Sequence, residues 1–307
     1  MRNAFADEVT QLALEDARVM LLSGDIGNRL FDKLRLQSPE RFLNCGIAEQ
    51  NMMGVAAGLG LSGLRPIVYT ITPFTTTRCL EQIKISVAYH ESPVVIVGTG
   101  SGLSYASLGP THHSLEDFAI LRAIPNMQIF APWDAPSLRS VLRQAIASGK
   151  PSYIRIGKKG EAQIAPHDRV PVIGDGLQVR SGSDVCLIAV GTLASEAISA
   201  AEQLSKKGIS AAVVLVHTVK PFPRKLLIKL AASFNEMLIV EEHAKLGGLG
   251  EQAKAELSQR QVHITSIGAD DVFMPVIGSQ RFARKYFGID ADSIAKTAYA
   301  TLRKKKS

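Results

Sequence analysis

The sequence is poor in cysteine and has no long apolar run. Its 307 residues include three cysteines, Cys45, Cys79 and Cys186, none of which belongs to a Cys-x-x-C pair. This spacing excludes the usual zinc ligand patterns, and an odd, sparse cysteine count is typical of a reducing cytoplasm. No apolar stretch approaches the roughly 20 residues that span a bilayer, and residues 1–16 lack the apolar core of a secretory signal. We therefore expect a cytoplasmic protein that does not span a membrane.

Aromatic residues are also scarce, at 6% of the chain, and they do not interleave with basic residues. Nucleic-acid binding is therefore not expected, although the formal net charge is +7. Part of that charge lies in the basic run at 303–306, which is most simply a solvated end of the chain. A modest positive charge suits anionic small-molecule substrates or an acidic partner subunit.

What the sequence does contain is an alternation of strand-like and helix-like segments. Hydrophobic residues make up 46% of the chain, enough for about two domain cores. Runs such as 94–98 and 185–190 are apolar on both faces, as buried parallel strands are, and helical periods such as 135–148 lie between such runs. The alternation predicts an α/β protein with two doubly wound, mainly parallel sheets. We expect one domain at 1–160, a linker at 161–184 without regular structure, and a second domain at 185–307.

One acidic residue, Glu49, lies in the otherwise small or apolar stretch 44–60. Gly54 and Gly58 are four residues apart, so on a helix they form a smooth face onto which another helix or a flat ligand can pack. A carboxylate at the start of such a helix is either desolvated or bound to a partner. From spacing alone two interpretations stay open for Glu49: an acid that caps its own helix, or a functional carboxyl group.

Several blocks, taken in order, resemble the transketolase group of thiamine diphosphate enzymes. The first-half blocks, which resemble the pyrimidine-binding domain, are Gly46-Ile47-Ala48-Glu49-Gln50-Asn51, Phe74 with Arg78, and Gly109-Pro110-Thr111-His112. The second-half blocks, which resemble the family's C-terminal domain, are Thr218-Val219-Lys220-Pro221, Glu241-Glu242-His243 and Gly247-Gly248-Leu249-Gly250. The order of the blocks makes the resemblance specific, and it covers nearly the whole chain.

The resemblance implies thiamine diphosphate as the cofactor and a role for each matching residue. Glu49 would be the catalytic acid that hydrogen-bonds the coenzyme's aminopyrimidine ring, a role that needs a desolvated carboxyl, provided by apolar neighbours such as Ile47 and Val55. Phe74 would pack on the pyrimidine ring, with an ordinary core phenylalanine as the alternative. Ile47 and Arg78 would also contact the cofactor. His112 would face the substrate as a second catalytic residue.

The substrate side departs from the family pattern. Other transketolases place an Asp where this chain has Leu108, and a His where Gly100 follows Thr99. The remaining substrate residues implied by the resemblance are Arg2, Ser23, His112, His113 and Lys158. Lys158 stands where Arg is usual, and the two are not equivalent for binding a phosphate group; His113 stands where Gln is usual, and its role is open. We expect an altered acceptor, bulkier or less charged than a pentose phosphate, such as a nucleotide-linked keto sugar.

The sequence has no match for the family's upstream domain, which binds the diphosphate through Mg²⁺ with a Gly-Asp-Gly motif and a downstream Asn. Gly174-Asp175-Gly176 has the letters, but no Asn lies between it and Asn235, and a turn is the simpler interpretation. We expect no metal ligand in this chain. Mg²⁺ would be bound by a partner, an N-terminal-type transketolase subunit, in an α2β2 heterotetramer.

The function expected from the resemblance is that of a β-type transketolase subunit, which transfers a two-carbon ketol unit to an aldehyde or keto-sugar acceptor. Two alternatives stay open: the β subunit of a 2-oxo acid dehydrogenase decarboxylase, which has a similar Gly-Ile-Ala-Glu-Gln block, and a non-catalytic scaffold partner. The Pro-Thr-His turn favours a transketolase, and Glu49 argues against a scaffold. A full deoxyxylulose phosphate synthase is not expected, since no diphosphate domain is found.

Overall fold

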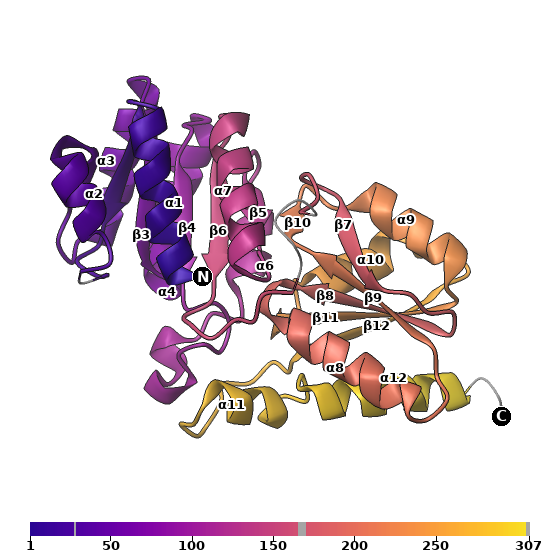
Figure 1. The fold of residues 1–307 in the computed structure, drawn as a ribbon. Coiled ribbons are helices and arrows are strands. Elements are labelled where there is room, and N and C mark those ends of the chain that lie inside the picture. The colour runs from indigo at the N-terminus through magenta and orange to yellow at the C-terminus, as the bar shows by residue number, and fades with distance from the viewer. Residues whose placement is uncertain (28, 165–169, 305–307) are drawn as a thin grey trace.

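The protein is described from a computed structural model, which covers residues 1–27, 29–164 and 170–304. Two sheets lie beside each other (Figure 1), with strand orders β10-β5-β6-β4-β3-β1-β2 and β12-β11-β8-β9-β7. All neighbouring strands are parallel except β10 against β5 and β7 against β9. The prediction of an α/β fold with two mainly parallel sheets is confirmed.

The first sheet is covered by helices on both faces. Phe5 and Val9 of one helix and Leu138 of another pack in the core on one face, and Met52 and Ile83 in the core on the other. The strands are β1 (Val19–Ser23), β2 (Phe42–Asn44), β3 (Arg65–Ile71), β4 (Val95–Thr99), β5 (Gln128–Phe130), β6 (Ser152–Ile156) and β10 (Thr218–Lys220). The helices are α1 (Arg2–Glu15), α2 (Asp32–Gln37), α3 (Glu49–Leu61), α4 (Thr72–Thr75), α5 (Leu80–Gln82), a π-helix (Ile83–Tyr89), α6 (Asp117–Arg122) and α7 (Ala135–Ser148).

The second sheet is likewise enclosed, with α8 and α12 below it and α9 and α10 above it in Figure 1. Its strands are β7 (Gly176–Arg180), β8 (Val185–Val190), β9 (Ala211–Val216), β11 (Glu236–Ala244) and β12 (His263–Ala269). Its helices are α8 (Ala194–Ser205), α9 (Arg224–Ser233), α10 (Leu249–Glu256), α11 (Gln280–Tyr286) and α12 (Ala291–Lys304). Among the described residues, none of the helices combines the length and apolar character needed to cross a membrane.

Two strands differ from what the sequence suggests. The prediction that 161–184 lacks regular structure is wrong at 176–180, because β7 forms there and pairs antiparallel with β9. Strand β10 follows the second sheet's β9 in the chain, yet it pairs with β5 at the edge of the first sheet. Each half therefore contributes to the other's boundary, and the division at 160 and 185 stays a prediction.

The two halves are also joined by a buried polar network at the end of β11. Arg155 of β6 donates to an Asp117 oxygen at 2.7 Å, and Tyr153 donates to the other Asp117 oxygen at 2.7 Å. The Leu103 amide, in the loop after β4, donates to Glu242 of β11 at 2.7 Å. The His243 ring stacks on Phe118 with the centroids 5.0 Å apart. These contacts fix the first sheet against the second.

Candidate active site

The candidate site lies where the first sheet's central strands end. In open α/β sheets, ligands bind beyond the carboxyl ends of parallel strands. Here α3 begins with Glu49 after β2, α4 follows β3 directly, and the loop from Gly100 to His112 follows β4. Thr72 at the start of α4 donates to the Thr99 carbonyl at 3.1 Å, so α4 and the loop after β4 are held together. The sequence thereby brings three separate segments to one edge.

Glu49 is buried within this chain, at 4% exposure, and paired with Arg78. Arg78 Nη1 donates to Glu49 Oε1 at 2.9 Å, and the Gln50 side chain holds the Arg78 carbonyl at 3.0 Å. The capping interpretation is not supported: the N-cap is Ala48, and no side-chain hydrogen bond caps this helix. No described residue donates a second hydrogen bond to the Glu49 carboxyl, which leaves Oε2 available to a ligand.

The apolar neighbours expected to desolvate Glu49 do not do so. Ile47 is 80% exposed and Val55 is also exposed. Burial comes instead from the loop after β1, where a Cβ on Gly24 would lie 3.4 Å from Glu49 Cγ. Burial, with the Glu49 charge adding to it, raises the pKa of the nearby Cys79 thiol to about 12, so that sulfur is an uncharged neighbour.

The small-residue face of α3 also differs from its expected use. Nothing within this chain lies within 4 Å of where a Cβ on Gly54 or Gly58 would be. The glycine that permits close packing is Gly60, where a Cβ would lie 2.3 Å from Ser92 Oγ. The Gly54–Gly58 face is therefore unused by the described part of the chain.

Phe74 and His112 continue the site from the ion pair. The Arg78 guanidinium lies over the Phe74 ring, 4.0 Å from its centroid, and the His112 ring meets Phe74 edge-on at 5.3 Å. Burial lowers the pKa of His112, and the Arg78 charge lowers it further, so its imidazole is neutral at pH 7 and can accept a proton or donate a hydrogen bond. Four of the predicted residues, Glu49, Arg78, Phe74 and His112, thus form one connected group.

The substrate side contains a residue that the sequence did not indicate, Tyr105. Gly100 has φ +85°, a backbone conformation that side chains disfavour. A Cβ at Gly100 would lie 2.0 Å from Tyr105 Cε2, so the Tyr105 ring fills the space next to it. The Lys158 ammonium lies 4.5 Å from the ring's centroid and His112 lies 5.9 Å from it. Arg2 donates to the hydroxyl of Tyr69 on β3 at 3.2 Å.

Two other predicted substrate residues lie elsewhere. Ser23 uses its hydroxyl to donate to the Ile26 carbonyl at 2.9 Å. His113 is 6% exposed and lines a separate cavity of about 380 Å³ with Leu115 and Met274. Its Nε2 has no hydrogen-bond partner among the described residues, and burial lowers the pKa of His113. Leu108 is exposed at the edge of the loop after β4.

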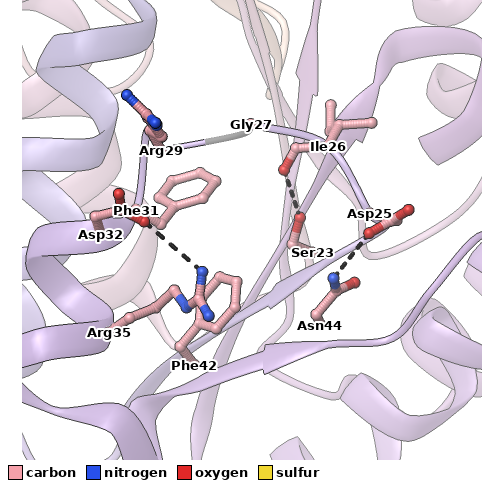
Figure 2. A pocket seen from close by; sticks show the side chains of 10 residues that line it. All are labelled: Ser23, Asp25, Ile26, Gly27, Arg29, Phe31, Asp32, Arg35, Phe42 and Asn44. Atoms are coloured by element: carbon pink, nitrogen blue, oxygen red, sulfur yellow. Dashed lines mark hydrogen bonds and ion pairs between the residues drawn. The ribbon is translucent and has the colours of Figure 1, made fainter.

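Ser23 belongs to a cavity of about 380 Å³ beside the ends of β1 and β2, shown in Figure 2. There Asn44 donates to Asp25 at 2.9 Å, and Arg35 lies over the Phe42 ring at 5.6 Å. Asp25 has φ +55°, an uncommon conformation that is enriched at functional sites. Asp25 and Asn44 were not among the predicted site residues, although both lie at strand ends, where a ligand site is expected.

The site suits the pyrimidine half of thiamine diphosphate but offers no place for its metal. A buried carboxyl with one oxygen available, next to an aromatic ring, can bind a flat, nitrogen-containing ring. Among the described residues, no three His, Cys, Asp or Glu side chains are grouped so as to hold a metal ion. What this chain presents is therefore half of a cofactor site.

Comparisons with known proteins identify the family. The family model "Transketolase, pyrimidine binding domain" matches residues 1–160, and "Transketolase, C-terminal domain" matches residues 174–294. One of the two subunits of an apulose-4-phosphate transketolase, from Phocaeicola vulgatus, is 33% identical over 305 residues, which cover 99% of this chain and 97% of that protein. The 6-deoxy-6-sulfo-D-fructose transketolase subunit SqwH of a Clostridium species is 33% identical, with 99% and 95% covered.

Solved structures agree. A split gene transketolase, described as an inactive beta4 tetramer, superposes with a TM-score of 0.88 at 31% identity and covers 98% of this chain and 97% of that one. A Pichia stipitis transketolase shares the fold, with a TM-score of 0.83 at 20% identity, and this chain corresponds to 46% of its length. The chain therefore belongs to the transketolase family of transferases, as a member of its split form that carries the pyrimidine-binding and C-terminal domains.

Proposed function

We propose that the chain is the β-type subunit of a thiamine diphosphate-dependent transketolase that transfers a two-carbon ketol unit to an aldehyde or keto-sugar acceptor. The observation that carries this proposal is the buried Glu49 carboxyl, linked through Arg78 and Phe74 to His112. When bound, thiamine diphosphate supplies the electron sink through which a C–C bond beside a carbonyl is broken and remade.

Each residue of this group has a role. Glu49 Oε2 hydrogen-bonds the remote nitrogen of the pyrimidine ring, in a pocket where the carboxyl is shielded from water. Phe74 packs on that ring. His112, neutral at pH 7, exchanges a proton or hydrogen bond with the oxygen of the reacting carbonyl. Arg78 holds Glu49 in place, because its guanidinium bridges the carboxyl and the Phe74 ring.

The rest of the cofactor site would come from a second chain. We propose an N-terminal-type transketolase subunit that binds the diphosphate through Mg²⁺, in an α2β2 heterotetramer. The absence of a metal-ligand cluster among the described residues supports this division. So does the relative described as an inactive beta4 tetramer, a split-gene chain without activity in that assembly. The names of the relatives favour this function over a 2-oxo acid dehydrogenase β subunit.

The substrate we propose is a small sugar with an anionic group. Two relatives are named for apulose 4-phosphate and for 6-deoxy-6-sulfo-D-fructose, which carry a phosphate and a sulfonate. Arg2 and Lys158 supply positive charge on the substrate side. With Leu108 and Gly100 in place of the family's Asp and His, the acceptor differs from a pentose phosphate. Ordinary turnover of ribose 5-phosphate with xylulose 5-phosphate would contradict that last point.

The experiment is reconstitution. The chain is purified from its native host with whatever binds it, the partner is identified by mass spectrometry, and the two chains are produced separately. Consumption of β-hydroxypyruvate, a two-carbon donor, and binding of thiamine diphosphate are measured for each chain and for the mixture. We expect both only in the mixture. Tight cofactor binding and turnover by this chain alone would overturn the proposed division of the site.

A further inference from the structure

Tyr105 occupies the place of a side chain that this protein lacks. The family's histidine position is Gly100 here, and the ring of Tyr105 lies so close that a Cβ at Gly100 would be 2.0 Å from Cε2 and 2.1 Å from Cδ2. Contacts shorter than 3 Å between such atoms do not occur without movement. Tyr105 is 8% exposed, so the ring is fixed by its surroundings. The glycine therefore does not open extra room; the tyrosine fills it.

The same ring lies between positively charged groups. The Lys158 ammonium is over the ring face at 4.5 Å, a distance at which the ring's electrons attract a cation. On the other side, the Arg2 charge lowers the pKa of the Tyr105 phenol against the larger, raising effect of burial, which shows that Arg2 is within electrostatic reach. His112 meets the ring at 5.9 Å, so Tyr105 connects the reacting end with the two cations.

We propose that Tyr105 is the specificity-determining residue of the substrate side: its ring replaces the missing side chain at Gly100, positions the Lys158 ammonium with Arg2, and selects a short sugar that ends in a tetrahedral anion. This inference rests on the proposed function. A lysine ammonium is a flexible point charge, and stacking on an aromatic face restricts it. The ring also limits the length of the pocket, which favours a short anionic sugar over the bulkier acceptor expected from the sequence.

The test separates charge selection from general activity. In the reconstituted enzyme, with β-hydroxypyruvate as donor, kcat and KM are measured for D-ribose 5-phosphate and for uncharged D-ribose. Tyr105→Leu removes the ring, Tyr105→Phe keeps it, and Tyr89→Leu is a control at an exposed tyrosine outside the site. We expect Tyr105→Leu to raise KM for the phosphorylated sugar roughly 5- to 10-fold, with kcat and the values for D-ribose nearly unchanged.

Three further results decide the matter. Tyr105→Phe and Tyr89→Leu should retain the wild-type preference for the phosphorylated sugar. The combination of Tyr105→Leu with Lys158→Met should cost no more than either change alone, because both act on the same cation. Equal loss on both sugars, or additive effects, would assign Tyr105 a merely structural role and overturn the proposal.

A measurement on the isolated chain keeps the two proposals separable. Inorganic phosphate should raise the thermal unfolding midpoint of the wild-type chain, and raise it less for Tyr105→Leu and Lys158→Met. Absence of any phosphate effect on the wild type would contradict the anion site whatever the enzyme does. Donor consumption without any change in sugar preference in Tyr105→Leu would refute this inference and leave the proposed function intact.

Discussion

The two sheets both end in charged residues, but the first sheet leaves them open while the second encloses them. Beside the first sheet, Glu49 is buried, yet its partner Arg78 is 42% exposed and one carboxyl oxygen has no donor among the described residues. At the end of β11, Glu241, Glu242 and His243 are all buried. Glu241 accepts hydrogen bonds from the Leu249 and Gly250 amides, at 2.8 and 2.9 Å.

The difference lies in where the hydrogen-bonding capacity goes. Buried polar groups need partners, and those of β11 find them inside the chain: Glu242 meets Arg284 of α11, and His243 Nδ1 lies 2.7 Å from the Ala244 carbonyl. A charged cluster satisfied in this way joins domains. A carboxyl that keeps an unused oxygen beside an aromatic ring is instead a binding site. The predictions below test this distinction.

The largest effect is expected from Glu49→Gln. Glutamine keeps the shape and can still accept the Arg78 hydrogen bond, but it has no proton to share with the cofactor. We expect kcat of the reconstituted enzyme to fall about 10²- to 10⁴-fold, with little change in the thermal unfolding of the chain. The matched control is Glu81→Gln, an exposed glutamate in the neighbouring α5. Unchanged turnover in Glu49→Gln would favour the scaffold interpretation.

The enclosed cluster predicts two opposing pH dependences of stability. Burial raises the pKa of Glu241 to about 7, so its contribution to stability is fully present below pH 4.5 and is lost as the pH rises through 7. Burial lowers the pKa of His243 to about 4, so its contribution is present above pH 6.5 and is lost as the pH falls through 4. Each amounts to roughly 3 kcal/mol, and in the wild type they offset each other.

Single substitutions should reveal each dependence in urea unfolding between pH 4 and 8. Glu241→Gln should lose stability more steeply than the wild type as the pH falls from 6.5 to 4, because the His243 contribution remains. His243→Asn should lose stability as the pH rises from 4.5 to 7, because the Glu241 contribution remains. Parallel pH profiles for the wild type and both variants would show that these groups titrate alike in the folded and unfolded chain.

The sequence predicts the position of the open site better than its details. The alternation of segments fixes parallel strands, whose carboxyl ends must share one edge, so the convergence of Glu49, Phe74 and His112 follows from their places after β2, β3 and β4. Strand β7 was missed because its pattern is short and polar, with burial only intermediate along its length. An edge strand paired on one side needs no continuous apolar run.

Side-chain directions within the loop after β4 were beyond the sequence. Residues 106–112 form two 3₁₀ turns, in which neighbouring side chains point apart, so His112 and His113 face different cavities. The Tyr105 ring fills the space beside Gly100 through the path of this loop, which no spacing rule gives. Burial of Glu49 by the Gly24 loop rather than by Ile47 is likewise a contact between segments distant in the chain.

A smaller effect is expected at His112. His112→Gln keeps a hydrogen-bonding side chain but cannot exchange a proton, and we expect kcat/KM to fall about 10- to 100-fold in the reconstituted enzyme. Since burial lowers the pKa of His112, wild-type activity should be constant above pH 6.5 and decline only at lower pH. The control is His90→Gln, an exposed histidine on the far end of the π-helix. Equal losses in both variants would remove His112 from the mechanism.

The smallest expected effect tests whether the open ion pair supports the fold or the function. Arg78→Gln leaves the buried Glu49 with a neutral donor in place of a charge, at a cost of roughly 1–2 kcal/mol, discounted because Arg78 is partly exposed. Arg78→Lys restores the charge without the planar group that lies over Phe74. If Arg78 serves only stability, lysine should recover both folding and turnover. If it also aligns Glu49 with Phe74, as we expect, lysine should recover the unfolding midpoint while kcat stays reduced, since the guanidinium is the group that contacts both.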